Sequence, residues 1–137
     1  MNDYASLVSD PNPIHRSEPL SSLSTPPIVH GMLVASLFSS ILGTLVPGAV
    51  YRSQTLKFEK PVYVDDVVVA RIDVEKLRTV AGQGVLMVCK TTVTRRTMTK
   101  EQNGDTVDDC VRGEAQVWLP MTMNDEAEHN DDKDLDR

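Results

Sequence analysis

An apolar segment that follows His30-Gly31 and runs to Leu42 or Leu45 places the strongest constraint on the fold. Apolar residues occupy every side of this segment, and only serines interrupt it, at Ser36, Ser39 and Ser40. A helix that is apolar all round must be surrounded by protein. At about fifteen residues, the segment is shorter than the roughly twenty that a membrane-spanning helix needs. We therefore interpret it as a buried helix and expect no membrane partner.

After Pro47-Gly48 the sequence changes from helical to alternating periodicity. Alternation of apolar and polar residues is typical of half-buried antiparallel strands. It occurs in four segments, 56–58, 70–75, 85–98 and 111–119, and the turn sequences Gly82-Gln83-Gly84 and Asn103-Gly104 lie between the later ones. An antiparallel sheet that curls around one central apolar helix is the α+β hot-dog fold, which is the architecture that we expect.

The charge of the chain is concentrated at its C-terminal end. The net charge is −6, and residues 122–137 contain seven acidic and two basic residues but few apolar ones. Such a segment cannot bury enough apolar surface to fold. We expect one hot-dog domain over residues 1–121 and an acidic disordered tail over residues 122–137. The domain itself is nearly neutral, so we expect no nucleic-acid partner.

The cysteines and the N-terminus indicate an intracellular protein. Cys89 and Cys110 do not form a CxxC pair, and we interpret them as reduced thiols that bind no metal. The first residues contain neither a secretory signal nor an arginine-rich transit peptide. We expect a cytoplasmic location, with a mitochondrial one as the alternative if a leader is missing from this chain.

Asp10 and His15 lie in a proline-rich loop, in which Pro11 and Pro13 flank Asn12. The ordinary interpretation of such a loop is a turn stabilised by its Asp and Asn side chains. The prolines also fix φ on both sides of Asn12, so they preorganise the carboxylate and the imidazole relative to each other. An imidazole and a carboxylate held together can bind one water, which suits general acid–base chemistry near neutral pH.

Two positions of the apolar helix have a functional as well as a structural interpretation. Gly31 either relieves strain at the start of the helix or lets a ligand approach its N–H group. The first N–H groups of a helix have no internal partner and can bind a carbonyl oxygen that gains negative charge. Ser39 either bonds to the helix backbone four residues earlier or supplies a functional hydroxyl.

Four segments of the sequence resemble the MaoC-like (R)-specific enoyl-CoA hydratase family. They are Asp10-Pro-Asn-Pro-Ile-His15, Pro27-Ile-Val-His-Gly-Met-Leu-Val-Ala-Ser-Leu-Phe-Ser39, Gln54-Thr-Leu-Lys-Phe-Glu-Lys-Pro-Val-Tyr-Val-Asp-Asp66 and Gly113-Glu-Ala-Gln-Val-Trp-Leu-Pro120. The resemblance covers nearly the whole domain. The short hydratases that supply polyhydroxyalkanoate synthesis and the mitochondrial 3-hydroxyacyl-thioester dehydratases are similar as well.

The resemblance implies a lyase that interconverts trans-2-enoyl thioesters and (R)-3-hydroxyacyl thioesters by addition or loss of water. Asp10 and His15 would be the catalytic dyad that holds the water, and the Gly31 N–H would bind the thioester carbonyl oxygen. Asn12 would shape the loop, and Ser39 would support the site by hydrogen bonding near Asp10. His30 would be a further supporting or substrate-binding residue.

The resemblance also implies partners and a missing element. The thioester carrier, CoA or an acyl-carrier protein, is part of the substrate, so no metal or redox cofactor is expected. The family implies a homodimer whose sheets join edge to edge. Its first strand lies ahead of the segment that begins here at Tyr4, so we expect this domain to lack that strand. Two alternatives stay open, namely an acyl-thioester hydrolase on the same fold and a catalytically weak truncated module that only binds acyl-CoA.

Overall fold

The computed structural model describes residues 2–16, 26–97 and 106–121. Two helices and a 3-10 turn come first, and five strands follow. In chain order they are α1 (Asn2–Val8), η1 (Pro13–His15), α2 (Gly31–Leu45), β1 (Val50–Gln54), β2 (Lys57–Phe58), β3 (Val67–Val80), β4 (Gly84–Thr97) and β5 (Thr106–Pro120). The expected tail over 122–137 and the Asn103-Gly104 turn lie outside the described residues. Within the described part, no helix is long and apolar enough to cross a membrane.

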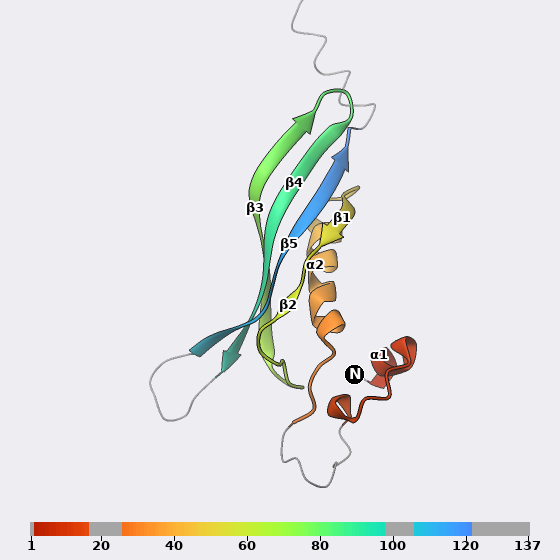
Figure 1. Ribbon diagram of the computed structural model, residues 1–137, viewed down its shortest axis with the longest axis vertical. Coiled ribbons are helices and arrows are strands. Elements are labelled where there is room, and N and C mark those ends of the chain that lie inside the picture. The colour runs from red at the N-terminus through yellow and green to blue at the C-terminus, as the bar shows by residue number, and fades with distance from the viewer. Residues whose placement is uncertain (1, 17–25, 98–105, 122–137) are drawn as a thin grey trace, which may run out of the picture.

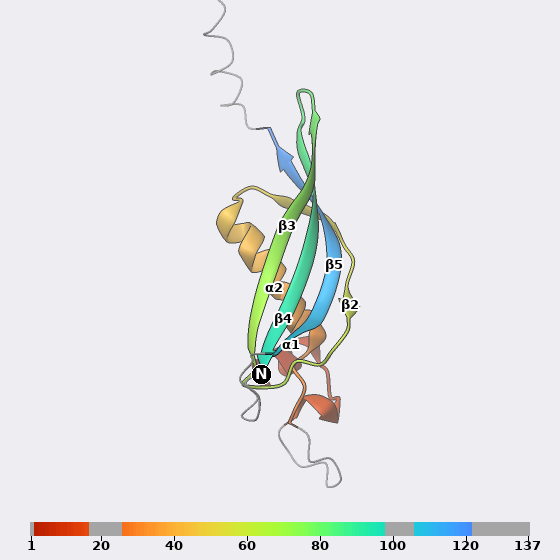
Figure 2. The same cartoon turned by 90° about the vertical axis from the view of Figure 1, so that its left-hand side faces the viewer.

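The strands form one antiparallel sheet with the order β1-β5-β4-β3, and β2 pairs with β5 beside β1. The three long strands make a meander, and Gly82 adopts a φ of 68° in the tight turn between β3 and β4. Helix α2 lies along one side of the curved sheet, as the two views show (Figures 1 and 2), and it packs against β3 and β4. The predicted α+β hot-dog architecture is confirmed.

Helix α2 buries one face rather than its whole circumference. Its buried residues are Val34, Ala35, Phe38 and Leu42. Their spacing places them on the side that faces the sheet. The serines and Met32 lie on the other side and are exposed. The apolar sequence predicts a helix that is enclosed on every side. Within the described residues of this chain, however, the sheet covers only one face of α2.

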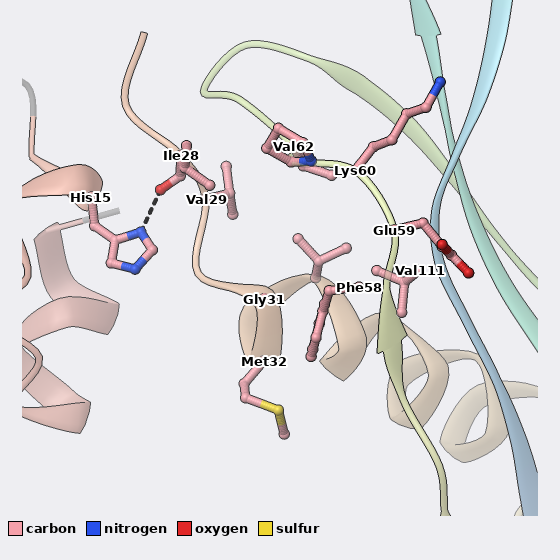
Figure 3. Close-up of a pocket in the computed structure, with 12 residues that line it drawn as sticks. His15, Ile28, Val29, Gly31, Met32, Phe58, Glu59, Lys60, Val62 and Val111 are labelled. Carbon is pink, nitrogen blue, oxygen red and sulfur yellow. Dashed lines mark hydrogen bonds between the residues drawn. The ribbon is translucent and has the colours of Figure 1, made fainter. Parts of the chain in front are cut away.

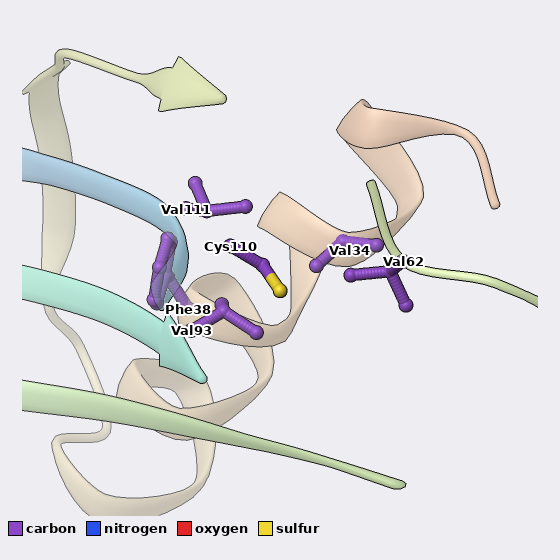
Figure 4. Packing of buried hydrophobic residues seen from close by; sticks show 6 residues of the cluster. All are labelled: Val34, Phe38, Val62, Val93, Cys110 and Val111. Carbon is purple, nitrogen blue, oxygen red and sulfur yellow. The ribbon is translucent and has the colours of Figure 1, made fainter. Parts of the chain in front are cut away.

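The core lies between α2 and the inner face of the three long strands. Phe38 is 1% exposed and contacts residues of β4 and β5 in a cluster that Figure 4 shows. Leu42 belongs to a second cluster further along the helix, which also contains Cys89. Cys89 and Cys110 are free and buried, and this burial raises the pKa of both thiols.

The alternating pattern of the sequence predicts the inward residues of β5 correctly but fails in part of β3. Val111, Ala115 and Val117 are buried, as predicted. The alternation of segment 70–75 places Val74 on the same face as Ala70 and Ile72, yet Val74 is exposed. The register between β3 and β4 shifts between Val74 and Lys76. An extra residue in one strand changes which face of the sheet the neighbouring side chains point to. The alternation therefore does not continue through this point.

Arg95 fixes the segment that follows β2 to the end of the sheet. Its guanidinium group donates hydrogen bonds to the Pro61 carbonyl and to the carboxylates of Asp66 and Asp108. The Arg95 side chain is only 14% exposed, so these charge-assisted bonds are shielded from water. The hydrogen bonds of Asp108 with Lys60 and Arg95 hold the pKa of its carboxyl below the usual range. Segment 61–66 is thereby held in place.

We expect Phe38→Ala to destabilise the domain by about 3–5 kcal/mol, because it removes a large buried ring and leaves a cavity. Leu7→Ala serves as the control, since it removes an apolar side chain that is 82% exposed. The control should change the free energy of unfolding by less than about 0.5 kcal/mol. Urea denaturation followed by circular dichroism measures both. Equal effects of the two substitutions would contradict the location of the core.

Candidate active site

The loop between α1 and α2 is organised by its own side chains. The Asp10 Oδ1 atom accepts the Asn12 N–H at 2.9 Å, and the Asn12 Oδ1 atom accepts the Ile14 N–H at 3.3 Å, which caps η1. Such side-chain turns are what Asp and Asn provide in proline-rich segments. Asn12 is exposed, and its contacts lie within the loop. The structure therefore places Asn12 where it shapes the loop, and it places Asp10 and His15 close together.

His15 is oriented by the segment that precedes α2. Its Nδ1 atom lies 2.6 Å from the Ile28 carbonyl oxygen (Figure 3), and the Ile28 N–H donates to the Ile14 carbonyl at 2.8 Å. A carbonyl oxygen only accepts, so Nδ1 of the neutral ring carries the proton. The Nε2 atom consequently presents a free lone pair, which is the form that a general base requires.

Asp10 and His15 face each other with two acceptor atoms. The His15 Nε2 atom lies 3.7 Å from the Asp10 Oδ2 atom, and both side chains are partly shielded from solvent. Two acceptors that face one another do not bond directly. They can instead share a water molecule, which donates one hydrogen to each of them. The geometry therefore allows one shared water, and the catalytic role of the dyad stays a prediction.

His30 is the third member of this cluster. It is 4% exposed, and its ring stacks on that of His15 with centroids 3.7 Å apart. The ring of Tyr4 makes a T-shaped contact with it, with centroids 5.1 Å apart. The His30 Nε2 atom lies 3.5 Å from the Asp10 Oδ2 atom, which is an ion-pair distance, but neither ring nitrogen makes a hydrogen bond to any described residue. Burial lowers the pKa of His30, and the charge of a protonated His15 lowers it further, whereas Asp10 opposes the change.

Gly31 begins α2 beside these side chains. No described residue accepts its N–H, which points out of the helix at the positive end of the helix dipole. A Cβ atom at Gly31 would lie 2.7 Å from the Phe58 ring, so the space beside the N–H is limited by this ring. Figure 3 shows Phe58 next to the start of the helix. The site therefore offers one free backbone donor beside an aromatic wall.

Two cavities meet at the cluster. One has a volume of about 430 Å³ and an apolar lining that includes Phe58 and Val62, and the other has a volume of about 490 Å³ and reaches Asp10 and His30. His15, Gly31 and Met32 line both cavities. Cavities of this size accommodate small organic ligands. A ligand in the apolar cavity would therefore have its polar end beside His15 and the Gly31 N–H.

The structure does not bring Ser39 to the site. Ser39 is exposed two turns along α2, it lines neither cavity, and no hydrogen bond joins it to Asp10, although both residues are described. Its supporting role stays a prediction. Conversely, Tyr4 and Phe58 line the cavities, and the sequence did not indicate either of them. Phe58 belongs to the alternating segment 56–58, whose pattern indicates packing in a sheet rather than a site.

The cluster contains the groups that can add water to an activated double bond. The dyad can position a water and take its proton. The Gly31 N–H at the helix start can stabilise negative charge on an oxygen atom. The apolar cavity can hold a hydrocarbon chain next to both.

Comparisons with known proteins show which family this chain resembles. The sequence profile described as MaoC like domain matches residues 1–97. An (R)-specific enoyl-CoA hydratase of Aeromonas caviae is 46% identical over 80 residues, which cover 55% of this chain and 59% of that protein. A mitochondrial 3-hydroxyacyl-acyl-carrier-protein dehydratase of Solanum lycopersicum is 34% identical over 122 residues, which cover 88% of this chain and 68% of that protein.

Solved structures show the same likeness. The (R)-hydratase from A. caviae involved in polyhydroxyalkanoate (PHA) biosynthesis has a TM-score of 0.68 and 38% identity, with 87% of this chain and 84% of that chain covered. An R-hydratase from Pseudomonas aeruginosa has a TM-score of 0.69 and 26% identity, with 88% and 72% covered. Because the family profile matches well over half of the residues, the chain belongs to the family of proteins with a MaoC-like domain.

Proposed function

We propose that this protein is a hydro-lyase that interconverts trans-2-enoyl thioesters and (R)-3-hydroxyacyl thioesters. The observation that carries the proposal is the pair of opposed acceptors, His15 Nε2 and Asp10 Oδ2, beside the free Gly31 N–H. The names of the similar proteins, an (R)-specific enoyl-CoA hydratase and a 3-hydroxyacyl dehydratase, support the reaction class and its stereochemistry. The carrier of the acyl group is CoA or an acyl-carrier protein.

The thioester binds where the two cavities meet. Its carbonyl oxygen accepts the Gly31 N–H, and its acyl chain extends into the apolar cavity between Phe58 and Val62. This placement brings the double bond, which is conjugated with the carbonyl group, next to the water held by Asp10 and His15. The position of His15 on the wall of both cavities supports this arrangement.

In the hydration direction, the water oxygen forms a bond to C3 while the dyad takes one of its protons. The electron pair of the double bond moves toward the thioester oxygen, where the Gly31 N–H and the helix dipole stabilise the negative charge. The dyad then returns a proton to C2, so one water is added in total. Dehydration is the same path in reverse. Neither direction requires a redox or metal cofactor.

A homodimer is part of the same proposal. The face of α2 that the sheet leaves uncovered contains Met32, and Leu45 and Val50 nearby in the chain are exposed as well. Large apolar side chains that a single chain leaves exposed become buried when they form an association surface. Light scattering after gel filtration should give twice the chain mass of 15.1 kDa. A species of the single-chain mass would contradict the homodimer.

We expect Asp10→Asn and His15→Ala each to lower the rate of crotonyl-CoA hydration by about 100-fold to 10,000-fold, because each removes a group that handles the proton of the water. Loss of the absorbance of the conjugated enoyl thioester measures the rate. Asp65→Asn is the matched control, since Asp65 is an exposed carboxylate whose positive φ of 71° asparagine adopts readily. Full activity in both dyad variants would contradict the assignment, and release of free thiol instead of hydration would favour the hydrolase.

The role of the Gly31 N–H has a test of its own. Gly31→Pro removes this N–H, and proline is well tolerated at the first position of a helix. Gly31→Ala keeps the N–H but introduces a comparable crowding against Phe58. We expect the proline variant to have a kcat about 100-fold to 1,000-fold lower than the alanine variant, which is the usual effect of losing one such donor. Equal kcat values of the two folded variants would refute the proposed role.

A further inference from the structure

The side chains of Asp10, His15 and His30 bring three potential metal-ligand atoms within 4.8 Å of one another. Asp10 Oδ2 lies 3.7 Å from the Nε2 atom of His15 and 3.5 Å from that of His30. In a tetrahedral zinc site with bonds of about 2.0–2.1 Å, neighbouring ligand atoms are about 3.4 Å apart. The two separations that involve Asp10 are therefore close to those of one zinc site.

The environment of His30 independently indicates that this cluster binds a ligand. It is 4% exposed, yet neither of its ring nitrogens has a hydrogen-bond partner among the described residues. A buried polar group without a partner is unfavourable, and an ion that binds to it is one recognised explanation. Its Nε2 atom points toward the Asp10 carboxylate rather than toward an apolar neighbour.

His15 already has the environment of a metal ligand. Its Nδ1–H donates to the Ile28 carbonyl oxygen at 2.6 Å, which leaves Nε2 free. Metal-binding histidines nearly always donate their other ring N–H to a carbonyl or carboxylate in this way, because the bond fixes the tautomer and the orientation of the ring.

The stacking of the two rings determines which of them must move. Their planes are 20° apart with centroids at 3.7 Å, and two nearly parallel rings cannot both hold one ion in their planes. One ring must turn, and the hydrogen bond to Ile28 holds His15 in place. His30 has no hydrogen bond to lose, so it is the ring that turns.

We propose that Asp10, His15 and His30 bind one divalent transition-metal ion of the Zn²⁺ type, and that the bound ion inhibits the enzyme. Two nitrogens and one carboxylate oxygen suit Zn²⁺ rather than Mg²⁺. The three residues line one cavity, which leaves the fourth position of the ion open toward it. The ion engages the lone pairs that hold the reacting water. The inhibition, unlike the binding, rests on the proposed function.

Isothermal titration of the full chain with ZnCl2 tests the binding without reference to activity. We expect one site per chain, and Asp10→Asn and His30→Phe should each weaken Zn²⁺ binding at least about tenfold. His30→Phe keeps an aromatic ring against His15 and Tyr4, and Asp10→Asn keeps the shape of the side chain, so circular dichroism should show both variants folded. MgCl2 should give no comparable binding.

His129→Ala is the control for the acidic C-terminal segment, because His129 is the remaining histidine of the chain and has acidic neighbours. Its Zn²⁺ affinity should equal that of the wild type. Unchanged affinity in the Asp10 and His30 variants, or loss of the site in His129→Ala, would overturn the metal site.

The inhibition is measured separately, by crotonyl-CoA hydration with saturating Zn²⁺ and again after addition of EDTA. We expect Zn²⁺ to abolish most of the activity and EDTA to restore it. An unchanged or increased rate with the site filled would overturn the inhibition. If the protein does not hydrate crotonyl-CoA under any condition, the proposed function fails, while the titration still decides the metal site.

Discussion

The extended segment 27–30 is hydrogen-bonded on both of its sides, and the geometry of the site depends on these bonds. On one side, two backbone hydrogen bonds of 2.7 and 3.1 Å tie it to segment 62–64, which Arg95 anchors to the sheet through Pro61. On the other side, Ile28 bonds to Ile14 and orients His15. The segment ends where α2 begins. One short segment therefore sets the relative positions of the dyad, the free Gly31 N–H and the apolar cavity.

The sequence predicted those parts of the fold whose patterns are long and regular. Helix α2 and the meander of β3, β4 and β5 have clear periodicity, and their existence was confirmed. Strand β1 was missed, because its five residues do not alternate and its pairing with β5 is irregular between Tyr51 and Ser53. The exposure of Val74 was missed for a related reason. A bulge depends on the partner strand, which a local pattern does not reveal.

In the site, too, the sequence predicts the residues whose signals are local. Asp10 and His15 lie in a stiff loop and Gly31 lies at a helix start, and the resemblance to the family joins the three. The packing of His30 on His15 arises from the meeting of two segments, so no spacing in the sequence contains it. Ser39 was predicted near Asp10 from the resemblance alone, and within this chain it faces away from the core.

In the proposed reaction, water held by Asp10 and His15 adds to a conjugated thioester in an (R)-specific manner. The product formed from crotonyl-CoA in water enriched in oxygen-18, identified by mass spectrometry and chiral chromatography, tests this reaction. We expect (R)-3-hydroxybutyryl-CoA with one heavy oxygen on C3 and with its thioester intact. Free crotonate and CoA, or a racemic hydroxy product, would contradict it.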